Sequence, residues 1–577
     1  MIRLLVYPIR ILGWWVAGLV RLVGRRKLQD TWLELALEGQ VQSVPTGTPR
    51  LQVLLRRLLS RRDEPSVDLR QLERMAQRIQ RRPEVRPKGL LVRLGALRVS
   101  WSEAEQLREV LHSVRDHGVP IVLFCGRAMD EKDAVIAAGA SRVVVGPAGG
   151  FDATGTAARG LFLGNALSLL GIRVESISAG RFKSGPDALT RGQRSDADRE
   201  QTEALVEALD RTLLKSLSAS RGMTEEQVWS ALEGGPYTAT GAQTVQFVDA
   251  VRRDEDLPEY CQSIEGAAEP PSFAPADRWL GVQKKPRPKV FRPARLAIVK
   301  VHGPIIDRAP AWLSSEAAVQ ASVVDDIRRA GADPRIRGVL VHIDSRGGSV
   351  TASDAIYGAL RRLARDKPVA TVMGSVAASG GYYIAAAGDR IWASPRTLTG
   401  SIGVFGILPT WPELLNRLGI GHDAIHRLAL ANLMDPSSGL SALERERVQA
   451  KVDDLYELFV NLVADRRGKS RDEVHEVAQG RVWVGEAAKD VGLVDELGGV
   501  DAACAWLKDR LDRPVEPEPV LLRHRTGLPR PPSTNVPQAL GRLNVLEVLP
   551  PVVREATLLT LMYGPDRCFA WSPLDHR

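Results

Sequence analysis

The chain has 577 residues, of which 44% are hydrophobic and 25% are charged, a composition that indicates a folded protein and excludes a disordered one. Its length indicates several domains. The net charge of +9 comes from an excess of arginine that carries no DNA- or RNA-binding signature, so we expect no nucleic-acid partner. The four cysteines lie far apart without metal-ligand spacing, and we expect neither a metal site nor a cofactor.

The first 27 residues, MIRLLVYPIRILGWWVAGLVRLVGRRK, form an apolar segment interrupted by arginines. At about 100° per residue, Arg3, Arg10 and Arg21 fall near one stripe of a helix, and apolar residues occupy its other faces. This pattern predicts an N-terminal amphipathic membrane-anchor helix over 1–27, lying in the membrane interface. A short span with snorkelling arginines and a soluble amphipathic helix stay open as alternatives. Basic residues on both sides give no preferred orientation.

A large internal repeat organises the rest of the chain. Residues 118–147 align without a gap on residues 366–395, so that Pro120, for example, falls on Pro368 at an offset of 248. Such a repeat predicts two homologous domains. Polar, proline-rich sequence separates the copies and also follows the second copy. The expected organisation is the anchor over 1–27, an N-terminal repeat over 28–252, a linker over 253–293, a C-terminal repeat over 294–511 and a proline-rich extension over 512–577.

Each copy alternates short β-branched runs with longer helical patterns. In the second copy the runs VLVHI, VATVM and DRIWAS alternate with amphipathic stretches such as TASDAIYGALRRLARD. This alternation is typical of an α/β fold in which parallel strands are joined by crossover helices.

The two copies differ where chemistry is expected. Ser379 stands in the small-residue run MGSVAASGGYY of the second copy, and the equivalent residue of the first copy is Glu131. Lys183 stands in GRFKSGPD of the first copy, and its equivalent in the second copy is Ala431. Since each copy retains one group that the other lacks, we predict a single composite site, in which Glu131 is a degenerate remnant.

A serine and a lysine can together form a nucleophile and its base. A lysine whose pKa is lowered by burial can accept the hydroxyl proton and later deliver it to a leaving amine. We therefore predict Ser379 as the nucleophile and Lys183 as the general base. The sequence leaves open whether the two groups meet within one chain or across two.

Two further turns fit this chemistry. The turn in DSRGGSVTAS holds Gly348, whose N–H, together with that of Gly380 beside the nucleophile, is predicted to bind the oxyanion. The turn in TGSIGVFG holds Ser401, whose hydroxyl is predicted to orient the lysine amine.

Together these motifs resemble the signal peptide peptidase A family, in its long tandem-repeat form, within the caseinolytic protease and crotonase superfamily. The resemblance implies two tandem crotonase/caseinolytic-protease-like domains built from parallel-strand ββα repeats. It also implies a serine/lysine-dyad endopeptidase that degrades cleaved signal peptides. A homotetramer in the bacterial cytoplasmic membrane, with its catalytic domain on the periplasmic side, is the implied setting, so peptides and membrane lipid are the expected partners.

The sequence departs from the family at the oxyanion turn, where Asn-Ser-Pro-Gly-Gly is usual and Asp344-Ser345-Arg346-Gly347-Gly348 stands here. Losing the proline puts the rigidity of the turn in question. Two rival functions stay open at this point. One is a crotonase-like acyl-CoA hydrolase or hydratase, and the other is a catalytically inactive membrane scaffold.

Overall fold

The computed structural model describes residues 31–44, 65–283, 294–308, 317–511, 520–521 and 568–571. The predicted anchor over 1–27 lies outside these ranges. Within them, no helix has both the length and the apolar character needed to cross a membrane. The chain divides into two compact units: unit 1 comprises 1–157 and 206–292, and unit 2 comprises 158–205 and 293–576.

Unit 1 is built on a parallel sheet with the strand order β10-β6-β4-β3-β1-β11, and β2 pairs with β1 at one end. Its central strands are nearly continuous apolar runs because both faces of a parallel sheet are covered. IVLFC of β4, for instance, is buried at every position. The strands are β1 (Trp32–Gln42), β2 (Ser66–Asp68), β3 (Gly89–Arg98), β4 (Ile121–Cys125), β6 (Arg142–Val145), β10 (Ala250–Val251) and β11 (Phe273–Pro275).

Several helices of unit 1 begin at side-chain caps. Ser100 and Glu103 form a reciprocal capping box at the start of α5, which satisfies amides that have no partner inside the helix. Three very short strands, β5 (Ala128–Met129), β7 (Gly150–Phe151) and β9 (Tyr237–Thr238), form a separate small sheet. The helices are α4 (Leu69–Arg81), η1 (Pro83–Val85), α5 (Trp101–Asp116), α6 (Glu131–Ala137), α10 (Glu225–Glu233), α11 (Ala239–Thr244), η2 (Asp254–Asp256), α12 (Leu257–Glu265) and α13 (Ala276–Gln283).

The stretch 253–293, predicted as a linker, is structured over its described part and belongs to unit 1. Strand β11 pairs in parallel with β1, from Trp32 opposite Phe273 onward. Helix α12 buries Leu257 and Cys261. The proline-rich composition concealed these elements because their apolar residues are few and widely spaced.

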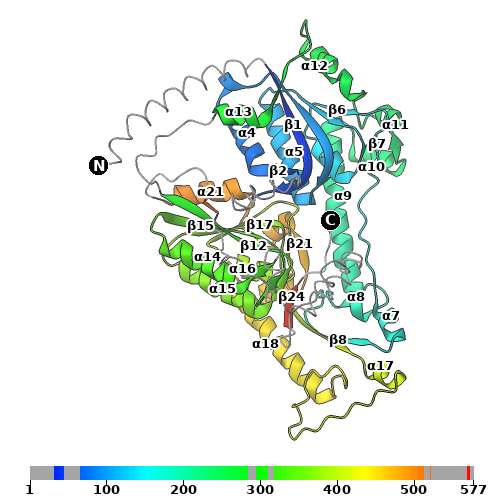
Figure 1. Ribbon diagram of the computed structural model, residues 1–577, viewed down its shortest axis with the longest axis vertical. Helices are drawn as coiled ribbons and strands as arrows, with labels where there is room; N and C mark the ends of the chain where they lie inside the picture. The colour runs from blue at the N-terminus through cyan, green and yellow to red at the C-terminus, as the bar shows by residue number, and fades with distance from the viewer. Residues whose placement is uncertain are drawn as a thin grey trace, which may run out of the picture. The chain divides into compact units, whose positions relative to one another are not determined.

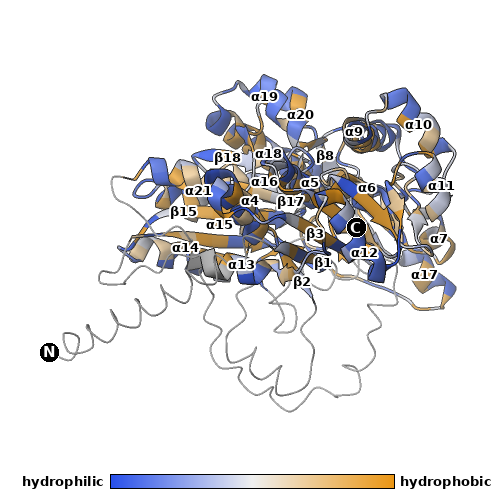
Figure 2. Ribbon diagram, turned by 90° about the horizontal axis from the view of Figure 1, so that it is seen from above, coloured by the Kyte–Doolittle hydropathy of each residue, from blue (hydrophilic) through white to orange (hydrophobic). Residues whose placement is uncertain are grey.

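Unit 2 holds a main sheet with the order β21-β19-β17-β15-β12-β23, and β18 joins β17 to β22. Its core pairs are parallel, as predicted for the α/β class. In Figure 2 the strands β15 and β17 are mostly orange, while the surrounding helices alternate between orange and blue. The strands are β12 (Arg295–His302), β15 (Ile336–Ser345), β17 (Val369–Ala378), β18 (Arg390–Ala393), β19 (Leu398–Gly400), β21 (Val482–Val484), β22 (Glu496–Leu497) and β23 (Val520–Leu521).

A second sheet of unit 2 has the order β14-β13-β16-β24-β20-β8. Its longest pairing is antiparallel and joins β8 to β20 from Ala179 opposite Val404 to Arg173 opposite Thr410. The strands are β8 (Arg173–Ala179), β13 (Ile305–Ile306), β14 (Ala318–Val319), β16 (Gly347–Ser349), β20 (Val404–Thr410) and β24 (Cys568–Trp571).

The helices of unit 2 include two that lie side by side along the main sheet, α14 and α15 (Figure 1). The long helix α9 (Asp196–Arg221) begins in unit 2 and continues into the part of the chain assigned to unit 1. The others are α7 (Gly164–Leu169), α8 (Asp187–Thr190), α14 (Gln320–Ala332), α15 (Val350–Leu363), α16 (Gly380–Ala385), α17 (Pro412–Arg417), α18 (Ala442–Arg467), α19 (Arg471–Val477), α20 (Gly485–Asp490) and α21 (Val500–Asp509).

The division into units differs from the predicted domain limits at 158–205. This segment was expected to belong to the repeat over 28–252, and it groups instead with residues 293–576. The physical reason is the β8–β20 pairing, which ties the segment to the second copy through a full antiparallel ladder. A repeat alignment compares copies but does not show which copy a strand pairs with.

Candidate active site

Ser379 occupies a sharp turn between the end of β17 and the start of α16. Its φ of 55° and ψ of −116° lie in a region that non-glycine residues seldom adopt. The turn is held on both sides, because the Ser379 N–H donates to the Gly400 carbonyl at 2.8 Å and its carbonyl accepts from Tyr383 N–H at 2.8 Å. Strained backbone held in this way often marks a functional position. The Ser379 side chain is fully buried.

The structure brings Lys183 and Ser379 together within unit 2 and within one chain. Lys183 Nζ lies 2.6 Å from Ser379 Oγ. The amine also donates to the Ser401 carbonyl at 2.8 Å and lies 3.0 Å from the Ser401 hydroxyl. When the amine is neutral, its two N–H groups can donate to the carbonyl and the hydroxyl of Ser401. The lone pair of the amine then faces the Ser379 hydroxyl.

Burial sets the protonation state of this amine. Lys183 is 5% exposed, and burial lowers its pKa well below the ordinary lysine value. Burial is the only cause of this shift, since no neighbouring carboxylate opposes it. Desolvation disfavours the ammonium form, so the site favours the neutral amine.

The two predicted oxyanion glycines are neighbours. A Cβ placed on Gly380 would lie 3.3 Å from the Gly348 nitrogen and 2.6 Å from Ser353 Oγ, so only glycine fits there. Gly348 has a φ of 152°, a conformation that L-residues rarely adopt. The turn has no proline at this position and is held by Ser345 Oγ, which accepts a hydrogen bond from Gly347 N–H at 3.1 Å.

The loop between α19 and β21 also braces the lysine, although no sequence signal pointed to it. Phe182 N–H donates to the Gln479 carbonyl at 2.7 Å, and Ser401 N–H donates to the Arg481 carbonyl at 2.7 Å. Gly480, with a φ of 80°, packs directly on the lysine, where an added Cβ would lie 2.6 Å from Lys183 N. This loop therefore fixes the Lys183 turn and the Ser401 turn together.

The first turns of α9 form a buried clamp on the Lys183 loop. Gln201 Nε2 donates to the Phe182 carbonyl at 3.2 Å and to Ser184 Oγ at 2.9 Å, while its Oε1 accepts from Val482 N–H at 3.3 Å. Asp198 Oδ1 accepts from Ser184 Oγ at 2.7 Å. Gln201 and Asp198 are 2% and 4% exposed. Neither residue could be predicted from the sequence, because a pair of polar residues on a long helix is typical of a solvent-exposed face.

Residues matched by the profile of peptidase family S49 are 113–263 and 361–513, and a Clp protease profile matches 312–397. The two S49 segments start 248 positions apart, at the offset of the internal repeat. The chain belongs to peptidase family S49. The predicted family resemblance is thereby confirmed.

Several curated S49 relatives resemble this chain. Protease 4 of Salmonella typhi is 30% identical over 408 residues, covering 69% of this chain and 65% of the relative. The chloroplastic serine protease SPPA of Arabidopsis thaliana is 27% identical over 460 residues, covering 78% and 67%. A putative signal peptide peptidase SppA of Enterococcus faecium is 33% identical over 216 residues, covering 37% and 63%. The chain thus spans about two thirds of the length of these relatives.

Glu131, the residue of the first copy that is equivalent to Ser379, has different surroundings in this S49 chain, and a histidine pair lies elsewhere in unit 2. Glu131 opens α6 of unit 1, where its carboxylate accepts Thr154 N–H at 3.1 Å. His342 lies 2.7 Å from His302, nitrogen to nitrogen, inside the main sheet of unit 2. The pKa of His302 is well below its ordinary value, first through burial and then through His342 and Lys300, so the imidazole is neutral.

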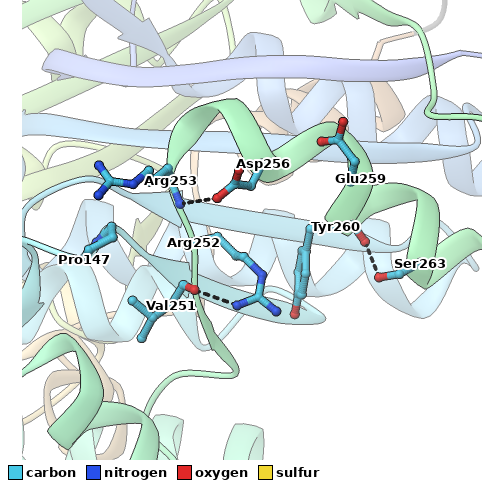
Figure 3. Close-up of a pocket in the computed structure, with 8 residues that line it drawn as sticks. All are labelled: Pro147, Val251, Arg252, Arg253, Asp256, Glu259, Tyr260 and Ser263. Atoms are coloured by element: carbon cyan, nitrogen blue, oxygen red, sulfur yellow. Dashed lines mark hydrogen bonds between the residues drawn. The ribbon is translucent and has the colours of Figure 1, made fainter.

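A separate pocket of about 550 Å³ lies in unit 1 (Figure 3). Two of its charged side chains make local contacts: Arg252 donates to the Val251 carbonyl at 2.8 Å and lies 5.9 Å from the Tyr260 ring centre, and Asp256 accepts Arg253 N–H at 3.2 Å. These side chains include no serine–lysine pair. The lining residues are Pro147, Val251, Arg252, Arg253, Asp256, Glu259, Tyr260 and Ser263.

Replacing the buried amine should stabilise this protein. Because the pKa of Lys183 is lowered on folding, the unfolded chain binds more protons between that value and the ordinary value of 10.5, and wild-type stability rises with pH in this window. One proton corresponds to about 1.4 kcal/mol per pH unit. Lys183→Met should therefore be more stable than wild type near pH 7, with an advantage that shrinks towards pH 10.

Denaturant unfolding at several pH values measures this difference in stability. The control is Lys451→Met, which replaces an exposed lysine on α18. An advantage of Lys183→Met that did not change with pH would contradict the prediction.

Removing the Gln201 side chain should change the pKa of Lys183 while the protein stays folded. Gln201→Met removes the side-chain acceptor of Val482 N–H and one of the two donors to the Phe182 carbonyl, and it should cost about 1–3 kcal/mol of stability. If the loop loosens and admits water, the pKa of Lys183 moves up towards its ordinary value, and the pH profile of activity moves with it. The neighbouring Glu200→Ala removes only exposed ion pairs to Arg181 and Arg481 and should leave the profile unchanged. An unshifted profile in a folded Gln201→Met protein would exclude a positioning role.

Proposed function

We propose that this chain is a serine endopeptidase that hydrolyses short apolar peptides, such as cleaved signal peptides, with a Ser379/Lys183 dyad. The observation that carries the proposal is the 2.6 Å approach of a buried, carboxylate-free amine to a strained serine hydroxyl. Membership of peptidase family S49 supports the same reaction class.

The first half of the reaction forms an acyl-enzyme. Neutral Lys183 accepts the Ser379 hydroxyl proton as Oγ attacks the substrate carbonyl carbon. The oxyanion that develops receives hydrogen bonds from the N–H groups of Gly348 and Gly380. When the C–N bond breaks, the Lys183 ammonium gives its proton to the leaving amine, and an ester on Ser379 remains.

The second half regenerates the enzyme. Water enters in place of the released amine, and Lys183 accepts one of its protons as the water oxygen attacks the ester carbonyl. Collapse of the second tetrahedral intermediate returns the proton to Ser379 Oγ and releases the carboxylic acid. Ser401 keeps the amine aimed through both halves, because its carbonyl and hydroxyl fix two of the three directions around Nζ.

The rival functions receive less support. An acyl-CoA hydrolase or hydratase would also use paired amides, but it gives no reason to hold a buried lysine against a serine. An inactive scaffold gives no reason to maintain the strained φ of Ser379 together with its four-partner network.

The peptidase proposal is tested by comparing four chains on a fluorogenic peptide with small or leucine-like residues before the cleaved bond. Ser379→Ala and Lys183→Arg should reduce kcat to background, a loss on the order of 10⁶-fold by comparison with other serine proteases. Arginine keeps the charge but cannot act as a base at neutral pH. Lys451→Arg, on the surface of α18, should retain wild-type kcat. Substantial hydrolysis by either dyad variant would defeat the mechanism.

We also propose that the chain works as a homotetramer at the bacterial cytoplasmic membrane, with its catalytic units on the periplasmic side. Exposed apolar side chains near α7 and α17 offer surface for such contacts: Leu169 is 78% exposed, Leu418 63%, Ile425 96% and Leu428 75%. Isolated exposed leucines are common, but a group of this kind marks an interaction surface.

Light scattering and membrane fractionation test this setting. The full chain should have four times the monomer mass of 63.0 kDa and should sediment with cytoplasmic membranes. Ile425→Asp combined with Leu428→Asp should lower the assembled mass, whereas the same change at exposed Leu458 on α18 should not. A monomeric wild-type chain in the soluble fraction would contradict both statements.

A further inference from the structure

Strand β24 lies between two strands that flank the dyad. On one edge it pairs antiparallel with β16, and Ala570 stands opposite Gly348. On the other edge it pairs antiparallel with β20, and Phe569 stands opposite Phe405. Figure 1 draws β24 in red, and it contacts α16, the helix that follows Ser379.

The two flanking strands form a slot for one extended chain. In the sheet order β16 and β20 are not paired with each other, and β24 alone connects them. Neighbouring strands lie about 4.8 Å apart, so the main chains of β16 and β20 are separated by about two such spacings. The facing edges offer main-chain donors and acceptors to whatever strand enters, as in β-augmentation.

The slot reaches the catalytic groups at both edges. Gly348, the predicted oxyanion donor, belongs to β16. Strand β20 begins directly after Gly403, whose carbonyl lies 3.4 Å from Ser379 Oγ. A peptide whose carbonyl is to reach Ser379 and Gly348 must therefore lie where Cys568–Trp571 lies.

The occupied slot leaves the nucleophile covered. Ser379 has no exposed surface, and all three residues of β16 are buried. A nucleophile must touch a substrate carbonyl, so part of the structure has to leave before a reaction. Only five residue pairs hold β24, three with β16 and two with β20. By contrast, β20 makes a long ladder with β8 and is fixed.

We propose that Cys568–Trp571 is a built-in inhibitor, a pseudosubstrate strand that occupies the peptide slot and must leave before a substrate enters. This inference rests on the proposed peptidase function, whose site it regulates. The segment, Cys-Phe-Ala-Trp, is uncharged and apolar, which matches the proposed apolar substrates. Substrate and inhibitor then compete for one slot.

Removing the segment should increase the apparent affinity for substrate. If β24 fills the slot nine-tenths of the time, a chain ending at residue 567 should show a KM about tenfold lower at unchanged kcat. Ala570→Pro should act in the same direction in the full chain, because proline lacks the N–H that a central strand needs. Asp575→Pro, outside β24, is the matched control and should leave KM unchanged.

A binding measurement separates this proposal from the peptidase proposal. The truncated chain with Ser379→Ala should bind a fluorescent peptide of residues 565–574, as measured by anisotropy, and the full-length Ser379→Ala chain should bind it more weakly. Binding without any wild-type hydrolysis would refute the peptidase function and retain the slot.

Two results would overturn the pseudosubstrate strand. The first is a KM unchanged in both the truncated and the Ala570→Pro chains, each with wild-type circular dichroism, while wild type hydrolyses peptide. The second is an intact mass showing that wild type, but not Ser379→Ala, loses residues after Ala570, because the segment would then be a consumed substrate rather than an inhibitor.

Discussion

A lysine amine buried without a counter-ion is the constraint on which the site depends. Such a group costs folding free energy unless it sheds its proton, so its surroundings must both exclude water and supply hydrogen bonds to a neutral amine. The Ser401 carbonyl and hydroxyl supply those bonds, and Gly480 leaves no space beside the Lys183 backbone. The guanidinium groups of Arg181 and Arg481 lie 4.9 and 5.0 Å from the centre of the Phe182 ring, and these contacts help to cover the loop. The arginines that flank this loop therefore contact an aromatic ring, and the lysine amine itself contacts Ser379 and Ser401.

The strain at the nucleophile is maintained by the same neighbours. Ser379 and Ser401 both have positive φ values, of 55° and 50°, and neither is a glycine. The Gly400 carbonyl holds the amide of Ser379, while the next residue, Ser401, is held by Arg481 and in turn holds the lysine. Two unfavourable conformations are therefore stabilised by one shared set of hydrogen bonds. This coupling explains how a small-residue turn can present a hydroxyl with little freedom to rotate away.

The α/β class could be predicted from the alternation of β-branched runs with helical patterns, and the meeting of Ser379 with Lys183 from a repeat in which each copy lacks what the other has. It did not reveal that residues 158–205 group with the second copy, since strand pairing between distant segments leaves no periodic trace. Asp198, Gln201 and Gly480 were missed for a related reason. Their roles arise from contacts across the fold, and each would be unremarkable in its local sequence. The elements within 253–283 were hidden by a composition typical of linkers.

The assignment of 158–205 to unit 2 has a consequence for the history of the chain. On the proposed dyad mechanism, a gene carrying only residues from 293 onward would encode the hydroxyl of Ser379 without its base. A gene carrying only the first copy would encode an amine with nothing to activate. The proposed mechanism therefore makes the two copies dependent on each other, because neither copy alone supplies both reacting groups.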